Sequence, residues 1–254
     1  MLTHTMLTRR TIVSLLLASL PLAARAQGSL LEKGKSLLGG AGGATGSSHA
    51  GAGLSEGEIG GGLKDALKVA SQRVVGRLGK ADGYFGDPAV RIPLPGPLQQ
   101  IAGPLRSVGA SGMIDDLQLK MNRAAEQAAP KALDIFTGAI SKMSITDARG
   151  ILSGPNDSAT QYFRRTTSDD LTTSFRPIVD KSLSNVGAVS ALKSVQSKAA
   201  SLPMGGGGVS SFSLTDFTVG KALDGLFHYM ASEENAIRTN PAARTTDLLK
   251  KVFG

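Results

Sequence analysis

Apolar residues recur every three or four positions along most of the chain after residue 54, which is the spacing of the buried face of an α-helix. The first such run consists of Ile59, Leu63, Ala66, Leu67, Ala70, Val74 and Leu78. Ser55 and Glu58 precede it at the spacing of a capping box, in which each side chain accepts a hydrogen bond from the other residue's backbone N–H. Gly79 is placed to end the helix. The pattern therefore predicts a helix that begins after Ser55 and ends near Leu78.

A second strong run predicts a long helix that Ser111 caps and that continues through Ala129. Its apolar stripe consists of Ile114, Leu117, Met121, Ala124, Ala125 and Ala128. We expect Pro130 to mark a kink or the start of the next helix, because proline is tolerated in a first turn but not in a helix interior. The apolar positions of that next helix are Leu133, Phe136, Ala139, Ile140 and Met143.

The second half of the chain shows further helical runs, separated by prolines, glycines and capping residues. We expect helices at 146–152, from Asn156 or Asp157 to about 165, from Ser168 to about 183, at 188–202, from Thr215 or Asp216 to about 230, and from Asn240-Pro241 onward. Pro177 should kink the helix that Ser168 caps. No alternation typical of a strand and no internal repeat is evident in the sequence.

A proline-rich stretch separates the first two long helical runs. Between residues 83 and 104 it contains Pro88, Pro93, Pro95, Pro97 and Pro104, which excludes a long helix or a central strand. Residues 90–95 are apolar and suited to extended backbone, so we expect an ordered loop laid across the helices, followed by a short helix at about 97–108. The sequence therefore predicts an all-α fold, an irregular multi-helix bundle with a proline-rich ordered loop.

The first 26 residues have the layout of a signal peptide. Arg9 and Arg10 form a basic region, residues 12–20 are apolar, and Ala24-Arg25-Ala26 offers small residues at the two positions that signal peptidase requires. A permanent anchor is the alternative, but the apolar run is short for a membrane span. The paired arginines resemble a twin-arginine signal, although Ser14 replaces the usual Lys, so the general secretory route stays open. We expect cleavage after Ala26 and a periplasmic protein.

The expected organisation has three parts. Residues 1–26 form the signal peptide, residues 27–53 a short amphipathic segment and a Gly-rich linker, and residues 54–254 the helical domain. The whole chain of 254 residues has a net charge of +8, and loss of three arginines with the signal peptide leaves a mildly basic +5. The chain contains no Cys, which excludes disulfides, thiolate metal sites and cysteine nucleophiles.

Residues suited to catalysis are sparse in this sequence. Of the two mature histidines, His49 falls in the linker and His228 is expected to be a partly buried helix residue. Three carboxylate pairs are present, at 115–116, 169–170 and 233–234. Both Asp pairs are predicted to lie in the first turn after a Ser cap, where the helix dipole favours negative charge. No glycine-rich stretch has the form of a phosphate-binding loop, so we predict no catalytic residue, no metal site and no cofactor.

Polar residues on otherwise apolar helices are the better candidates for binding. Gln118, Asn122 and Glu126 form one stripe at steps of four, with Arg123 beside it. A second group at an expected helix end consists of Gln161, Tyr162, Arg164 and Arg165, and Arg91 lies in the proline-rich loop. These residues are interpreted either as solvated helix faces and basic helix ends or as the polar lining of a binding groove.

Several long stretches of the mature chain resemble a known family. They are residues 88–95, 121–126, 154–165, 175–179 and 240–254. On these stretches, the segment from residue 54 to residue 254 resembles a family of bacterial exported proteins known only as a domain of unknown function. The resemblance implies an exported helical domain. It brings no known activity and no assigned catalytic residue.

The main hypothesis is an extracytoplasmic, non-catalytic helical binding protein. Its partner would be a small apolar or amphipathic ligand or an envelope protein, and we expect no nucleic-acid partner. The alternative is a peripheral envelope protein that touches anionic lipid through residues 29–38 and 250–253. An unrecognised hydrolase is a third hypothesis, for which the sequence names no substrate.

Overall fold

The computed structural model describes residues 55–185, 187–200, 212–240 and 250. Its elements are α2 (Glu56–Leu78), α3 (Gly96–Ser107), α4 (Ser111–Ala128), the 3-10 turn η1 (Ala129–Lys131), α5 (Ala132–Lys142), α6 (Ile145–Ser153), α7 (Ser158–Asn185), α8 (Ala188–Ala200) and α9 (Leu214–Thr239). No strand occurs among the described residues. The predicted all-α fold is confirmed.

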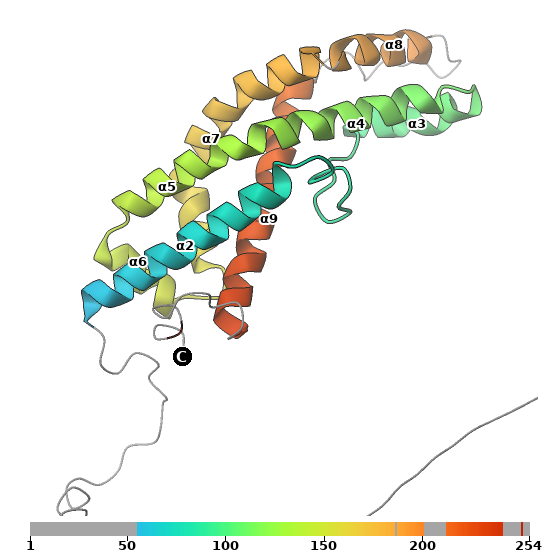
Figure 1. Ribbon diagram of the computed structural model, residues 1–254. Coiled ribbons are helices and arrows are strands. Elements are labelled where there is room, and N and C mark those ends of the chain that lie inside the picture. The colour runs from blue at the N-terminus through green and yellow to red at the C-terminus, as the bar shows by residue number, and fades with distance from the viewer. Residues whose placement is uncertain (1–54, 186, 201–211, 241–249, 251–254) are drawn as a thin grey trace, which may run out of the picture. The chain divides into compact units, whose positions relative to one another are not determined.

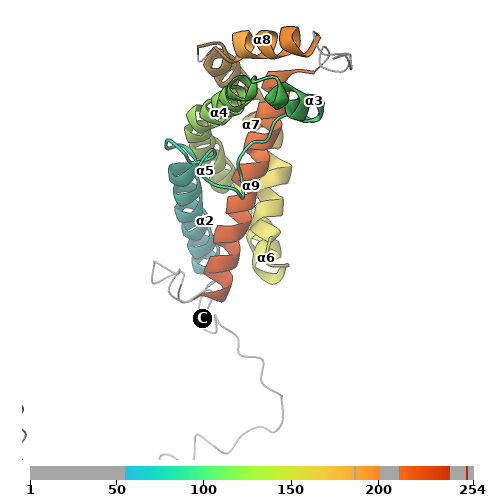
Figure 2. The same cartoon turned by 90° about the vertical axis from the view of Figure 1, so that its right-hand side faces the viewer.

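Helix α9 is the centre of the packing. It contacts α7 most extensively and also contacts α2 and α4, while α4 packs against α7 and α2 packs against α5 (Figure 1, Figure 2). The start of α4 lies with α3 and α8 at one end of the bundle. Within the described part of the chain, no helix is both long enough and apolar enough to cross a bilayer.

Small residues and a few large ones fill the core. The predicted stripe of α4 is wholly buried: Ile114, Leu117, Met121, Ala124, Ala125 and Ala128. Alanine on this face lets neighbouring helices approach closely. Phe136 supplies bulk at the centre, with its ring centroid 4.9 Å from that of Phe163 and 6.4 Å from that of Phe227. Burial of these side chains therefore stabilises the fold at positions where the sequence pattern predicted a buried helix face.

Capping boxes mark the starts of α2 and α6. Ser55 caps α2, and the predicted box is formed: Glu58 N donates to Ser55 Oγ at 3.3 Å and Ser55 N donates to Glu58 Oε2 at 2.8 Å. A second box, not predicted, joins Ser144 and Asp147 at the start of α6. Each box satisfies backbone N–H groups that a helix start leaves without intrahelical partners.

Three predicted caps are wrong. Ser111 is the first helical residue of α4, after an N-cap at Ala110 that has no side-chain bond. Ser168 lies inside α7, where its Oγ donates back to the Arg164 carbonyl at 2.5 Å and does not cap a helix start. The two helices predicted before and after Ser168 are therefore one helix. Helix α9 begins after Ser213, whose Oγ accepts from the Asp216 N–H, and not at Thr215 or Asp216.

These corrections change the interpretation of the charged residues. The Asp pairs at 115–116 and 169–170 lie beyond the first turns of α4 and α7, so the predicted dipole argument does not apply to them. Residues 161–165 lie in the first two turns of α7, near its N-terminus, and not at the C-terminal helix end that was predicted.

The prolines expected to interrupt helices lie in one connection and inside two helices. Pro130 lies in η1, the 3-10 turn that joins α4 to α5, and Pro104 and Pro177 are accommodated inside α3 and α7. The proline-rich loop is residues 79–95, between α2 and α3. The expected signal peptide, the segment 27–53 and nearly all of the helix expected from Asn240-Pro241 lie outside the described residues.

Candidate functional site

Side chains of α4 hold the proline-rich loop. Glu126 is 3% exposed, and its Oε1 accepts hydrogen bonds from the backbone N–H groups of Tyr84 and Phe85, both at 3.1 Å. Asn122 is fully buried; its Oδ1 accepts from Ile92 N at 2.8 Å and its Nδ2 donates to Ile92 O at 3.0 Å. These bonds replace the secondary-structure partners that buried loop backbone would otherwise lack.

The remaining predicted residues near the loop extend the same network. Gln118 Nε2 donates to Ile92 O at 3.2 Å. Arg123 bridges Glu126 Oε2 at 2.7 Å and Asp82 Oδ1 at 2.8 Å. Arg91 is exposed, and its Nε donates to Phe85 O at 2.6 Å. The structure thus brings together Arg91, Gln118, Asn122, Arg123 and Glu126, each of which makes at least one hydrogen bond to the backbone or to a charged side chain of the loop.

The loop is also fixed by a buried tyrosine. Tyr84 is fully buried, and its hydroxyl donates to the Ala222 carbonyl of α9 at 2.7 Å. Burial, and secondarily the negative charge of Glu126, raise the pKa of the Tyr84 phenol well above its usual range. The phenol therefore stays protonated in the fold and joins the loop to α9.

This raised pKa predicts alkaline destabilisation. Above the ordinary tyrosine pKa of 10.0, the unfolded chain releases the Tyr84 proton while the folded chain retains it. The free energy of unfolding should then fall by about 1.4 kcal/mol per pH unit for this group, with no such fall at lower pH. Urea unfolding from about pH 8 to pH 11 measures it. The variant Tyr84→Phe should lose about 1 kcal/mol at neutral pH and show a shallower alkaline fall; an unchanged slope would refute the assignment.

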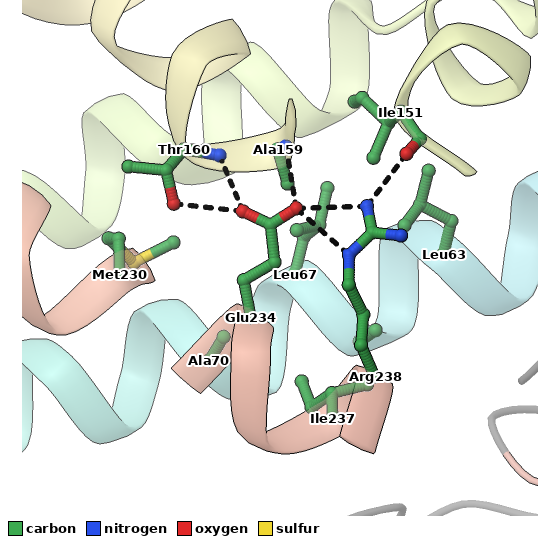
Figure 3. A pocket seen from close by; sticks show the side chains of 11 residues that line it. Leu63, Leu67, Ala70, Ile151, Ala159, Thr160, Met230, Glu234, Ile237 and Arg238 are labelled. Atoms are coloured by element: carbon green, nitrogen blue, oxygen red, sulfur yellow. Dashed lines mark hydrogen bonds and ion pairs between the residues drawn. The ribbon is translucent and has the colours of Figure 1, made fainter. Parts of the chain in front are cut away.

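A second buried carboxylate organises the start of α7. Glu234 of α9 is 6% exposed, and it accepts from Ala159 N at 2.8 Å, Thr160 N at 2.9 Å and Thr160 Oγ1 at 2.9 Å. Arg238 donates to Glu234 Oε1 from Nε at 3.2 Å and from Nη2 at 3.0 Å, and Nη2 also donates to Ile151 O at 2.7 Å (Figure 3). Glu234 thus supplies acceptors and negative charge to the N-terminus of α7.

The cavity beside Glu234 is small and apolar. Figure 3 shows Leu63, Leu67, Met230 and Ile237 around the carboxylate, and the cavity volume is about 20 Å³. That volume holds one water molecule. The Glu234 cluster is therefore a structural junction between α2, α6, α7 and α9, and not a ligand pocket.

An open groove lies where α6 turns into α7. This α6–α7 groove has a volume of about 410 Å³ and is lined by Thr146, Asp147, Gly150, Ile151, Pro155, Asp157, Ser158, Gln161, Tyr162 and Arg165. Gln161 Nε2 donates to Asp157 Oδ2 at 3.0 Å, and the Tyr162 hydroxyl donates to Ala139 O at 3.1 Å. Three predicted binding residues, Gln161, Tyr162 and Arg165, therefore meet in one groove.

The charged residues of this groove are the cation Arg165 and the carboxylates Asp147 and Asp157. The guanidinium carbon of Arg165 lies 5.7 Å from the Tyr162 ring centroid, and no carboxylate of the described residues lies within ion-pairing distance of it. Hydrogen bonds from Ser144 lower the pKa of Asp147, and the charge of Arg165 lowers it further. Burial, then the charge of Asp147, raise the pKa of Tyr162. Arg165 thus offers free donors beside a protonated tyrosine.

The other predicted residues lie elsewhere. Arg164 is directed away from the groove lining, with its guanidinium carbon 4.4 Å from the Phe227 ring centroid. His228 is exposed, not partly buried as predicted, and its ring packs edge-on to Tyr229 with the centroids 5.1 Å apart. Among the described residues, no three His, Asp or Glu side chains gather as a metal site requires.

The sequence analysis noted Glu234 only as half of the 233–234 carboxylate pair, and it did not single out Arg238. The separation of four residues between Glu234 and Arg238, which suits a helical ion pair, was a further local signal. Their decisive partners, the Ala159 and Thr160 N–H groups, stand 75 and 74 residues away. Only the packing of α9 against α7 reveals the role.

Comparison with known proteins gives a family. Residues 53–254 match the family model described as "Protein of unknown function (DUF4197)". Neither the curated proteins nor the solved structures contain a match. The family match covers most of the chain and agrees with the observed helical fold. The chain belongs to the DUF4197 family.

Proposed function

We propose that this protein is an exported, non-catalytic binding protein whose ligand occupies the α6–α7 groove. The observation that carries the proposal is Arg165, which lines a groove of about 410 Å³ and has no carboxylate of the described residues within ion-pairing distance. Sites for small molecules commonly have volumes of about 300–1,000 Å³, apolar walls and a few placed polar groups.

The lining indicates the chemistry of the ligand. Ile151, Pro155 and the edge of Tyr162 supply apolar contact, while Arg165 supplies a planar cation with several N–H donors. Such a combination favours a small amphipathic molecule with a carboxylate or a similar anionic group, because a guanidinium binds carboxylate oxygens in pairs.

The acidic side chains already have hydrogen-bond partners within the protein, which supports binding over catalysis. The buried carboxylates of Glu126 and Glu234 accept from backbone N–H groups and from arginines. Within the groove, Asp147 belongs to a capping box and Asp157 accepts from Gln161. A general base needs a carboxylate or imidazole within reach of the reacting proton, and these side chains already have structural partners.

Export is part of the proposal and rests on the layout of residues 1–26. An envelope protein is the other partner class for the same groove. Contact with anionic lipid would instead use residues 29–38 and 250–253, of which only Lys250 is described, as an exposed residue. No described contact favours that alternative.

Isothermal titration with octanoate and decanoate, with octanol as the uncharged control, tests the groove. We expect the carboxylates to bind the wild-type protein and Arg165→Gln to bind them at least about tenfold more weakly, because a hydrogen bond to a charged group contributes about 1.5–3 kcal/mol. Arg164→Gln is the matched control, since Arg164 is the neighbouring arginine outside the groove, and should bind like wild type. Equal weakening in both variants, or no binding of any amphiphile, would contradict the proposal.

A further inference from the structure

A second groove lies on another part of the molecule, between the proline-rich loop and α9. This loop–α9 groove has a volume of about 300 Å³ and is lined by Ala89, Val90, Arg91, Pro93, Lys221, Asp224, Gly225 and His228. It shares no lining residue with the α6–α7 groove, and the proposal for it does not depend on the function proposed above.

Both walls of the groove are fixed. The loop wall is held by the bonds from Asn122 to Ile92 and from Glu126 to the Tyr84 and Phe85 N–H groups. The helix wall packs directly on the loop at Gly225, where an added Cβ would lie 2.7 Å from Cε1 of Tyr84. A ligand would therefore meet a preorganised surface, which lowers the entropy lost on binding.

Arg91 is oriented into a defined position on this surface. Its Nε donates to Phe85 O at 2.6 Å, and its guanidinium carbon lies 5.0 Å from the Phe85 ring centroid. No carboxylate of the described residues lies within ion-pairing distance of Arg91. The two terminal nitrogens therefore keep their donors for an anion, in the planar arrangement that matches two phosphate oxygens.

The α9 side of the lining carries two further nitrogen-bearing side chains. Lys221 and His228 stand on the α9 side, and both are solvent-accessible. Asp224 is the acidic residue of the lining, and it pairs with Lys221 at 2.9 Å. The His228 imidazole makes a ring contact with Tyr229 but no hydrogen bond with a described residue. Its nitrogens thus remain available to a bound anion.

We propose that the loop–α9 groove binds a phosphate group, with Arg91 as the main ligand and with His228 and Lys221 as secondary ligands. The phosphate belongs to a small phosphorylated molecule or to a lipid headgroup. The Arg91 fork contacts two phosphate oxygens, and the α9 side chains contact the remaining ones.

Titration of the folded full-length protein with phenyl phosphate, followed by NMR or calorimetry, tests the site. We expect binding to wild type, no binding of phenol, and at least about tenfold weaker binding by Arg91→Gln. His228→Gln is a second variant that leaves the loop anchors intact, and it should weaken binding severalfold. Arg106→Gln, on α3 and outside the groove, is the matched control and should bind like wild type.

Cosedimentation with phosphatidylcholine vesicles that contain phosphatidic acid distinguishes the two phosphate sources. Vesicle binding that Arg91→Gln abolishes assigns the site to a lipid phosphate, whereas phenyl phosphate binding without vesicle binding assigns it to a soluble molecule. The proposal is overturned if wild type binds neither probe, or if Arg91→Gln and His228→Gln both bind phenyl phosphate as tightly as the control variant does.

Discussion

Replacing Glu234 with alanine should lower the free energy of unfolding by about 3–5 kcal/mol, the range for removing one partner of a buried ion pair. Two physical losses add up at this site. The Ala159 and Thr160 N–H groups at the start of α7 lose their acceptor, and Arg238 loses the carboxylate with which it pairs. Because these groups join α6, α7 and α9, the loss affects the whole bundle.

Urea unfolding, followed by circular dichroism, measures the effect of Glu234→Ala. The adjacent Glu233→Ala is the matched control, because Glu233 forms an exposed pair with Arg73 at 3.3 Å and should contribute less than about 1 kcal/mol. Glu234→Gln keeps acceptor oxygen but no charge, so its effect should lie between those of the two alanine variants. If Glu234→Ala and Glu233→Ala cost the same, Glu234 is not the junction that its contacts indicate.

Replacing Glu126 with alanine should cost about 2–4 kcal/mol, because it leaves the buried Tyr84 N–H and the partly buried Phe85 N–H without an acceptor, each at about 1–3 kcal/mol. The effect should also be local. Hydrogen exchange at the Tyr84 and Phe85 amides should accelerate strongly, since Glu126 Oε1 is their acceptor. Exchange in α8, far along the chain from the loop, should change much less.

Asp134→Ala is a suitable control for the Glu126 variant. Asp134 is a carboxylate on the neighbouring helix α5, 73% exposed and paired with Lys131 at 2.9 Å, so its loss should change stability by less than about 0.5 kcal/mol. Unaltered exchange at the Tyr84 and Phe85 amides in Glu126→Ala would mean that the loop does not depend on α4 for its conformation.

The sequence predicted the fold best where neighbouring residues determine the structure. The capping box at Ser55 and Glu58 and the spacing of apolar residues placed α2 correctly, because both signals act within one or two helical turns. Ser168 shows the limit of such signals. A serine can cap a helix or bond back to the carbonyl four residues earlier, and only the continuous packing of α7 against α9 selects the second state.

The arrangement of the candidate residues was predicted in part, for a related reason. The step of four between Gln118, Asn122 and Glu126 correctly indicated one polar face of α4. The partners of that face are loop atoms 26 to 42 residues away, so the sequence pattern did not reveal that the polar face holds a loop. Gln161, Tyr162 and Arg165 were identified together because they share two turns of α7, but the α6 wall of their groove comes from tertiary packing.

Native mass spectrometry tests the central claim, that the α6–α7 groove holds a ligand, most directly. The mature protein and its Arg165→Gln variant would be purified from the periplasm without denaturant, and each would be weighed before and after denaturation. We expect an added mass on the wild-type protein that denaturation releases and that the variant lacks. A bare chain mass for the wild-type protein, or the same added mass on both proteins, would contradict it.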